Sequence, residues 1–433
     1  MPSRCTMSNP LPGPEDIRRV ELDNGIVVLG RHHPHSPAVA VQGYLQVGSL
    51  NDPDDKLGLA GFTAAALMRG TRHYEHQALY DALESRGASL GIGGHTHTTG
   101  FGGQALAEDL PLLLDILAQA LRFPTFPAEQ VERLRAQWLT SLALREQNTG
   151  EMADLTFDRL AYDGHPYARP DDGTPDTIRA LTLDDLSAFH RRHYGPQGMV
   201  IAIVGGIEPQ QAVALVAQAL GDWQNPAQPA PAALPPLPPL RETRREEVFI
   251  PDKSQADIVL GVPGPSRTDP DYIPLALGNS VLGQFGLMGR IGDVVREQAG
   301  LAYYAYSSLS GGPGPGPWTV HAGVAPQNVE PAIELIRREL TRFVTEPVTD
   351  EELADVQSGA IGSLPLSFET NRGSASALLH LERYQLGLDY YRRYPDLIRA
   401  VTPERILQAA RRFLDPERLA IAVAGTLDSG ATP

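Results

Sequence analysis

Pairs of histidines are the residues in this 433-residue sequence whose type and spacing could bind a metal ion. His95 and His97 lie two positions apart, so on a β-strand both side chains would point to one face and could share a metal ion. A third ligand is not apparent in the sequence. The other close histidines stand in a turn-like segment and in a hairpin loop: His73 and His76, and His32, His33 and His35. We interpret all of them as surface or core histidines and expect no tightly bound catalytic zinc.

Two glycine-rich runs invite comparison with phosphate-binding loops, but neither has the required context. LGIGG (90–94) is followed by strand-like residues, and SGGPGPGP (310–317) has no Lys-Ser/Thr after it. A phosphate-binding loop opens a helix, and a P-loop also contains that lysine. We interpret both runs as strand ends and loops. The formal net charge of −16 also argues against a general nucleic-acid binder, because phosphate binding needs a cationic surface.

The composition indicates a soluble globular protein, with 42% hydrophobic and 20% charged residues. No apolar run approaches the roughly 20 residues of a membrane helix. Residues 1–15 lack the unbroken apolar stretch of a secretion signal, so we predict a cytoplasmic location. The single cysteine, Cys5, excludes internal disulfides and a thiolate metal cluster.

The elements around these residues form two similar halves. The proline-rich, uncharged run NPAQPAPAALPPLPPL (225–240) predicts a stiff, extended connector. The segments 181–207 and 401–427 both indicate a capped helix, a turn and a buried strand. We therefore predict a tail (1–16), a domain (17–224), a linker (225–241) and a second domain (242–433), the two domains being related by duplication.

Each half is predicted to be an α+β sandwich, with helices on one face of a largely antiparallel sheet. Residues 20–49 and 246–264 indicate equivalent strand pairs at the start of the halves, and helices follow. In one of these helices, five leucines recur at spacings that place them on one face: Leu110, Leu113, Leu114, Leu117 and Leu121.

The segment LDNGIVVLGRHHPHSPAVAVQGYLQVGSLNDPDDKLGLAGFTAAALMRGT (22–71) resembles the N-terminal domain of the pitrilysin and insulinase zinc peptidases, most closely the two-subunit mitochondrial processing peptidase branch. Active members carry His-x-x-Glu-His after the Gly-Leu-Ala, in which two histidines on one helix face bind Zn²⁺ and the glutamate acts as base. Here those positions hold Gly61, Ala64 and Ala65.

The resemblance therefore implies a chain that has lost its zinc ligands and its general base together. The family's third ligand, a glutamate, is expected near residues 137–141, where no carboxylate stands; Glu132 and Glu146 are off register. Neither His-x-x-Glu-His nor His-Glu-x-x-His occurs anywhere in the chain.

A second segment, residues 277–308, resembles the part of the family's C-terminal domain that carries an arginine and, seven positions later, a tyrosine. In active members this pair reaches the zinc centre: the tyrosine stabilises the oxyanion and the arginine grips the substrate backbone. Arg296 and Tyr303 have that separation, although Tyr304 and Tyr306 are close by. Without the resemblance, Arg296 would be interpreted as a helix cap and Tyr303 as a strand aromatic. The resemblance also implies a substrate-handling loop near Gly283 and Gly286.

The resulting hypothesis is a non-catalytic subunit of a heterodimeric zinc metalloendopeptidase. It would bind no cofactor itself, pair with a zinc-bearing homologue, form half of a chamber for unfolded peptides, and supply Arg296 and Tyr303 in trans. Alone it would be inactive, and it could form a homodimer. The alternative is a scaffold of the same fold without a proteolytic role.

Overall fold

The computed structural model describes residues 11–427, and within these only the backbone of residues 285, 287 and 288. Cys5 and the start of the predicted tail lie outside them. The chain forms two compact units, each built on one sheet. No helix in the described range is long and apolar enough to cross a bilayer.

The sheet of unit 1 has six strands in the order β1-β2-β6-β3-β5-β4. Its strands are β1 (Arg18–Glu21), β2 (Val27–His32), β3 (Ala38–Leu45), β4 (Ser89–Gly94), β5 (Thr99–Leu106) and β6 (Val200–Gly205). β2 and β6 are parallel and every other pair is antiparallel. β4 is therefore an edge strand.

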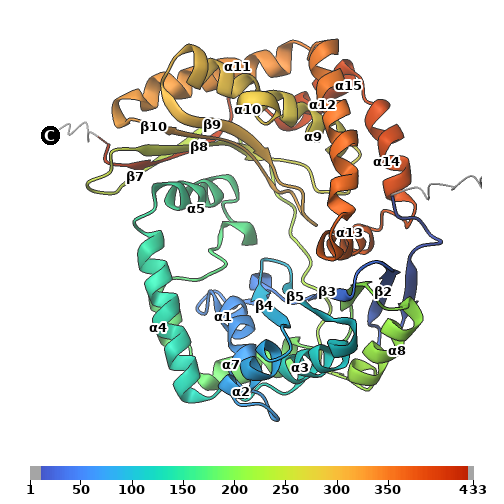
Figure 1. Cartoon of the computed structure of the whole chain (residues 1–433). Helices are drawn as coiled ribbons and strands as arrows, with labels where there is room; N and C mark the ends of the chain where they lie inside the picture. The colour runs from blue at the N-terminus through green and yellow to red at the C-terminus, as the bar shows by residue number, and fades with distance from the viewer. Residues whose placement is uncertain (1–10, 428–433) are drawn as a thin grey trace, which may run out of the picture. The chain divides into compact units, whose positions relative to one another are not determined.

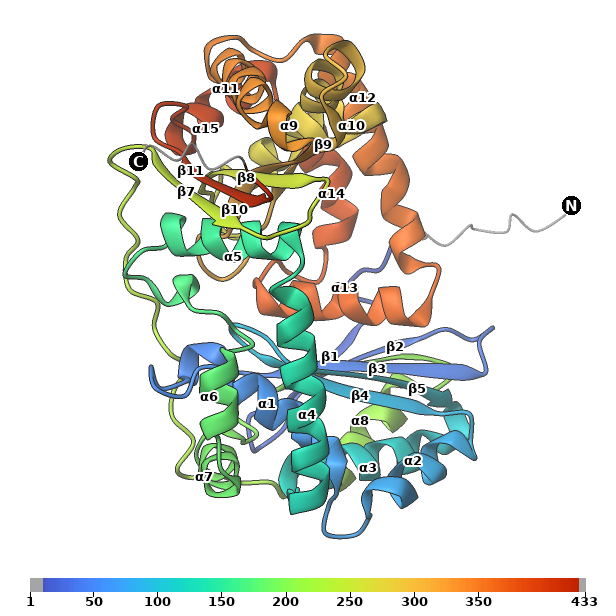
Figure 2. The same ribbon diagram turned by 90° about the vertical axis from the view of Figure 1, so that its left-hand side faces the viewer.

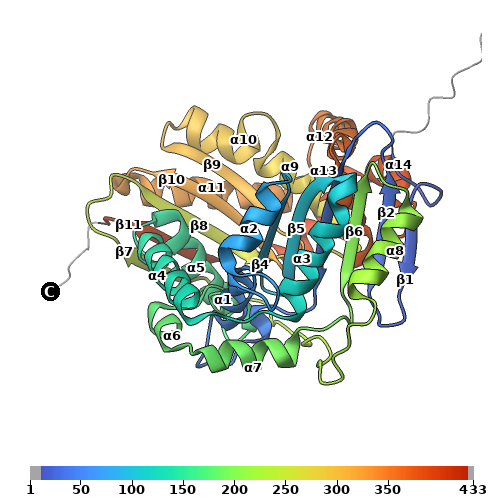
Figure 3. The same ribbon diagram turned by 60° about the horizontal axis from the view of Figure 1, so that its bottom comes forward.

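Helices cover one face of this sheet, and one further helix covers the other (Figures 2 and 3). The helices that cover the first face, and those next to them, are α1 (Leu59–Ala66), α2 (His76–Glu84), α3 (Leu110–Arg122), α4 (Ala128–Arg145), α6 (Pro175–Ala180), α7 (Leu183–His193) and α8 (Pro209–Leu220). The opposite face packs against α13 (Asn371–Arg383), which contacts β3 and β6. All five predicted leucines of α3 are buried in the core between helices and sheet, which confirms that helix face.

The sheet of unit 2 has five strands in the order β7-β11-β8-β10-β9. Its strands are β7 (Arg244–Phe249), β8 (Ala256–Pro263), β9 (Ala302–Leu309), β10 (Pro317–Val324) and β11 (Ala420–Gly425). β7 and β11 are parallel and the other pairs are antiparallel. This order repeats β2-β6-β3-β5-β4 of unit 1 strand for strand, which agrees with the predicted duplication.

The helices of unit 2 follow the same plan (Figure 1). They are α5 (Thr149–Ala161), α9 (Tyr272–Gly283), α10 (Phe285–Gly292), α11 (Val329–Thr345), α12 (Asp350–Ser363) and α15 (Pro403–Phe413), together with the part of α14 (Tyr390–Arg399) from residue 394 on. In Figure 1, α9, α10, α11 and α15 lie on one side of the sheet and α5 on the other. Short 3₁₀ turns complete the chain at 49–51, 67–69, 107–109, 166–168, 326–328 and 364–368.

The α+β class and the two tandem sheets confirm the predicted fold, but the units do not follow the predicted boundaries. Residues 143–169 belong to unit 2 and residues 363–393 to unit 1. The reason is that α5 buries Ala153 and Phe157 against β8 and β11, while α13 packs on the first sheet. Each half of the sequence thus contributes one helix to the other half's sheet. No helix or strand forms between residues 228 and 240, as expected of the linker.

Candidate functional site

Helix α1 carries the three positions at which the zinc motif would stand. Its start is fixed by the buried Asp52, whose carboxylate accepts two backbone N–H groups of the first turn at 2.8 Å each. Gly61, Ala64 and Ala65 then follow at spacings that share one helix face. None of the three has a side-chain atom that could bind a metal ion or accept a proton.

The space beside Gly61 is occupied by protein. A Cβ at Gly61 would lie 3.6 Å from two ring atoms of Trp138, and a Cβ at Gly94 of β4 would lie 2.7 Å from the Cα of Gly61. The indole of Trp138 is held by a 3.0 Å hydrogen bond to the carbonyl of Asp172 and by edge contact with Phe62, with ring centroids 5.6 Å apart. A side chain at position 61 would therefore begin in van der Waals contact with the indole.

The region of the expected third ligand also lacks a suitable donor. On α4, the hydroxyls of Thr140 and Ser141 donate to carbonyls of their own helix at 2.9 and 3.2 Å. Gln137 accepts a hydrogen bond from Arg69, and Glu132 pairs with Arg135 at 3.1 Å. Over residues 11–427, no group of three or more His, Cys, Asp or Glu could hold a metal ion. The donor set does not fit zinc.

The histidines singled out in the sequence are separated and mostly engaged with protein. His95 and His97 lie in the turn between β4 and β5 and not on a strand, so the strand geometry that would place both side chains on one face is absent. The turn forms because the His95 N–H donates to the Thr98 carbonyl at 2.8 Å. His33 and His76 each have a ring nitrogen within hydrogen-bond distance of an oxygen, that of Asn371 and that of Met68 respectively.

Arg296 lies in a short π-helical segment, η5 (Asp293–Gln298), that continues from α10. Such segments are rare and often occur at functional sites. The guanidinium is partly exposed, and its Nε lies 3.7 Å from the carboxylate of Glu297. Gly300 follows the segment, and its φ of +64° is in the region that favours glycine. Leu301 then donates a 3.1 Å hydrogen bond back to a carbonyl of η5, which fixes the turn into β9.

Tyr303 lies at the start of β9, an edge strand, and its side chain is 70% exposed. On the partner strand β10, Val324 pairs with Ala302 and Gly323 pairs with Tyr304. Tyr303 has no counterpart, so it is the extra residue of a β-bulge. Bulges redirect side chains and recur beside active sites. The structure therefore places Arg296 and Tyr303 at the two ends of one short, defined turn.

The two glycines of the predicted substrate-handling loop differ in their surroundings. A Cβ at Gly283, the last residue of α9, would lie 2.2 Å from the backbone nitrogen of Ser307 on β9. Gly283 is thus required for the close approach of helix and strand. Gly286 has a φ of +64° and open space around its missing side chain. Only Gly286 has the freedom expected of a substrate-handling position.

A polar cluster that the sequence did not reveal lies on the α5 side of the second sheet. His321 of β10 stacks on Tyr306 with centroids 5.0 Å apart, and its Nδ1 is 3.6 Å from Asp154 of α5. Burial, with the charges of Asp257 and Glu151, raises the pKa of Asp154 to about 6, and burial lowers the pKa of His321. No sequence signal joins these residues, because they come from segments far apart in the chain.

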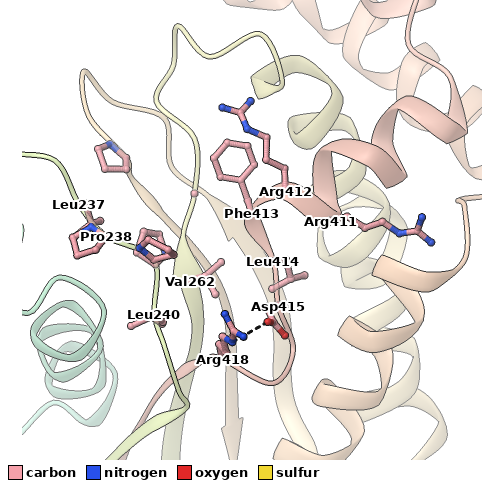
Figure 4. A pocket seen from close by; sticks show the side chains of 14 residues that line it. Leu237, Pro238, Leu240, Val262, Arg411, Arg412, Phe413, Leu414, Asp415 and Arg418 are labelled. Carbon is pink, nitrogen blue, oxygen red and sulfur yellow. Dashed lines mark ion pairs between the residues drawn. The ribbon is translucent and has the colours of Figure 1, made fainter.

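A cavity of about 410 Å³ in unit 2 lies apart from Arg296 and Tyr303 (Figure 4). The linker residues Leu237 and Leu240, the strand residue Val262 and the end of α15 form its walls. Its charged side chains already have partners. Arg418 pairs with Asp415 at 3.3 Å, Arg412 pairs with acidic residues outside the cavity, and Arg411 donates hydrogen bonds to two backbone carbonyls. We assign no chemistry to it.

Two family models match the chain. The model described as insulinase (peptidase family M16) matches residues 27–170, and the model described as the peptidase M16 inactive domain matches residues 180–359. An uncharacterized zinc protease of Streptomyces coelicolor is 28% identical over 419 residues, 95% of this chain and 90% of that protein. Cytochrome b-c1 complex subunit 1, mitochondrial, of Homo sapiens is 29% identical over 273 residues, 61% of this chain and 55% of that protein.

Solved structures show the same fold. The peptidase M16 inactive domain from Pseudomonas fluorescens superposes with a TM-score of 0.87 at 27% identity, covering 94% of this chain and 97% of that one. A protease from Helicobacter pylori superposes with a TM-score of 0.88, covering 96% and 100%. At 18% identity this second likeness concerns the fold alone.

Proposed function

We propose that this chain, which belongs to the insulinase (M16) peptidase family, is the non-catalytic subunit of a two-chain metallopeptidase. The observation that carries the proposal is a contrast within this one chain. The zinc-motif positions on α1 have no donor atoms, and Gly61 lies beside Trp138, whereas Arg296 and Tyr303 stay accessible on a defined turn.

In this proposal the two chains would supply different catalytic groups. The partner would provide the zinc ion and the general base. This chain would provide the Tyr303 hydroxyl as a hydrogen-bond donor to the oxygen on which negative charge develops, and the Arg296 guanidinium as a fixed cation near the peptide backbone. Donors held in place before the reaction stabilise a transition state because they need no reorganisation.

Edge strand β4 supports a peptide-binding role in unit 1. β4 pairs only with β5, so its other edge can accept a further strand. Gly91 and Gly93 have no atom within 4 Å of where a Cβ would be, so the sheet face is open beside this edge. An extended peptide that pairs with a sheet edge is recognised mainly through its main chain. Selection would then depend on the ability of the substrate to unfold.

The alternative is a structural subunit without a proteolytic role. The similarity to cytochrome b-c1 complex subunit 1 favours it, because that protein is a subunit of a larger complex. A scaffold has no need of Tyr303 or Arg296, so the two proposals differ in what happens when these side chains change.

The test is peptide hydrolysis by this chain, by a homologue from the same organism that carries His-x-x-Glu-His, and by the two mixed. We expect activity only in the mixture, or a large increase on mixing. Activity that is unchanged by mixing, with no complex detected by light scattering, would exclude the proposal. A complex without activity would favour the scaffold.

A further inference from the structure

The bulge that exposes Tyr303 coincides with a row of three residues across the second sheet. Tyr304 on β9 pairs with Gly323 on β10, and Gly323 pairs with Asp257 on β8. Partners in register on neighbouring strands share one face of a sheet. Tyr304, Gly323 and Asp257 therefore lie side by side on the face that also carries α5.

The hydroxyl of Tyr304 donates a hydrogen bond to Asp257, two strands away. The ring can span the distance because Gly323 has no side chain: a Cβ there would lie 2.5 Å from the Cε1 atom of Tyr304. Burial and this hydrogen bond raise the pKa of Tyr304, so the phenol stays protonated and remains a donor.

Asp257 is a rigid acceptor. It is only 4% exposed, and it also accepts hydrogen bonds from Gln255, at 2.9 Å, and from Thr149 at the start of α5. A buried carboxylate with several donors is held in one place, because losing any of them would leave buried charge unsatisfied.

We infer that Tyr304, Gly323 and Asp257 are positioning residues for Tyr303. The row fixes Tyr304 opposite Gly323, while one residue earlier Ala302 pairs with Val324. The register between these two pairs must take up one extra residue, which is Tyr303. The geometric part of the inference stands on these contacts alone. Its importance for peptide hydrolysis rests on the proposed function.

Tyr306 offers a matched comparison. It lies on the same strand and face, two residues beyond Tyr304, and stacks on His321 with an angle of 7° between the rings. Its register with β10 is regular. Loss of its hydroxyl should leave the bulge unchanged.

The experiment places 3-fluorotyrosine at position 303 and records its ¹⁹F resonance in the full chain. Tyr304→Phe removes only the hydroxyl, and Gly323→Ala places a methyl group where the ring lies. Tyr306→Phe and Gly312→Ala are the controls; a Cβ at Gly312 would have no neighbour closer than 3.9 Å. Thermal unfolding of each variant confirms that it is folded.

We expect the resonance to move or broaden in the first two variants and to stay in place in the controls. An unchanged resonance in folded Tyr304→Phe would overturn the inference. Hydrolysis by the mixture with the zinc-bearing homologue is measured separately, and we expect kcat to fall roughly 10- to 100-fold with KM little changed, as for a misplaced catalytic group. A moved resonance with unchanged kcat would retain the positioning role and count against the proposed function.

Discussion

A buried ion pair should fix helix α10, which leads into the segment that carries Arg296. Arg290 of α10 is 9% exposed and makes two parallel hydrogen bonds to Glu352 of α12, at 2.7 and 2.6 Å. Its Nη1 also lies 3.7 Å from Glu339 of α11, which is 6% exposed. The change Arg290→Met would leave the buried carboxylate of Glu339 without this cation.

We expect Arg290→Met to lower the free energy of unfolding by about 3 kcal/mol, near the lower end for a broken buried pair because Glu352 is 31% exposed. For a unit of this size, that corresponds to a fall in melting temperature of roughly 10 °C. Differential scanning calorimetry of the full chain measures it, with the two units allowed separate transitions. The control is Arg399→Met, whose 62% exposed side chain pairs with Asp396 at 3.2 Å and should contribute only about 0.5 kcal/mol.

The stabilisation that Arg290 gives through Glu352 should depend on pH. The hydrogen bonds from Arg290 lower the pKa of Glu352 from 4.5 to about 2. A lowered pKa stabilises the fold above the unfolded value, and the stabilisation is lost as the pH falls from 4.5 towards 2. The difference between wild type and Arg290→Met should therefore shrink over that interval. Equal melting temperatures for Arg290→Met and Arg399→Met at neutral pH would refute the reasoning.

Three further predictions concern the candidate site and its surroundings. Reintroducing the motif on α1 as Gly61→His, Ala64→Glu and Ala65→His should give well below one zinc per chain by elemental analysis, because Trp138 lies beside position 61 and residues 137–141, where the third ligand is expected, contain no carboxylate; stoichiometric zinc would contradict this. Asp154→Asn should stabilise the chain by no more than about 1 kcal/mol at pH 8 and have little effect at pH 4. The raised pKa of the 54% exposed Asp154 makes its ionisation unfavourable in the folded chain, and this cost grows as the pH rises from 3.8 to about 6 and is constant above; urea unfolding at both pH values checks the sign. Gly283→Ala should destabilise the chain by about 2 kcal/mol or more through its clash with β9, and Gly286→Ala by only about 1 kcal/mol through its positive φ; the opposite order in thermal unfolding would show that α9 and β9 are less closely packed than described.

The sequence predicts well those features that depend on neighbouring residues. The leucine spacing of α3 and the capped helices before β6 and β11 are local patterns, and the structure contains both. The duplicated strand order agrees with the likeness between residues 181–207 and 401–427. The missing zinc donors can also be identified from the sequence, because glycine and alanine carry no ligand in any fold.

The sequence could not predict features that depend on contacts between distant segments. The periodicity of α5 shows that one face is apolar but not which sheet it covers, so the exchange of α5 and α13 was missed. Nothing near Trp138 indicates that its indole packs against Gly61. The bulge at Tyr303 depends on Gly323 and Asp257, which are distant in the chain, so its exposure could not be foreseen from the strand pattern.

The most direct test of the central claim is the effect of Tyr303→Phe and Arg296→Ala in this chain on hydrolysis by the mixture with its zinc-bearing homologue. Loss of one oxyanion donor lowers kcat by about 100- to 1000-fold in other hydrolases, so we expect a large fall in kcat for Tyr303→Phe while the subunits still associate. Tyr306→Phe should have no effect. Unchanged kcat for the altered chain, with the complex intact, would contradict the account and leave the scaffold as the better description.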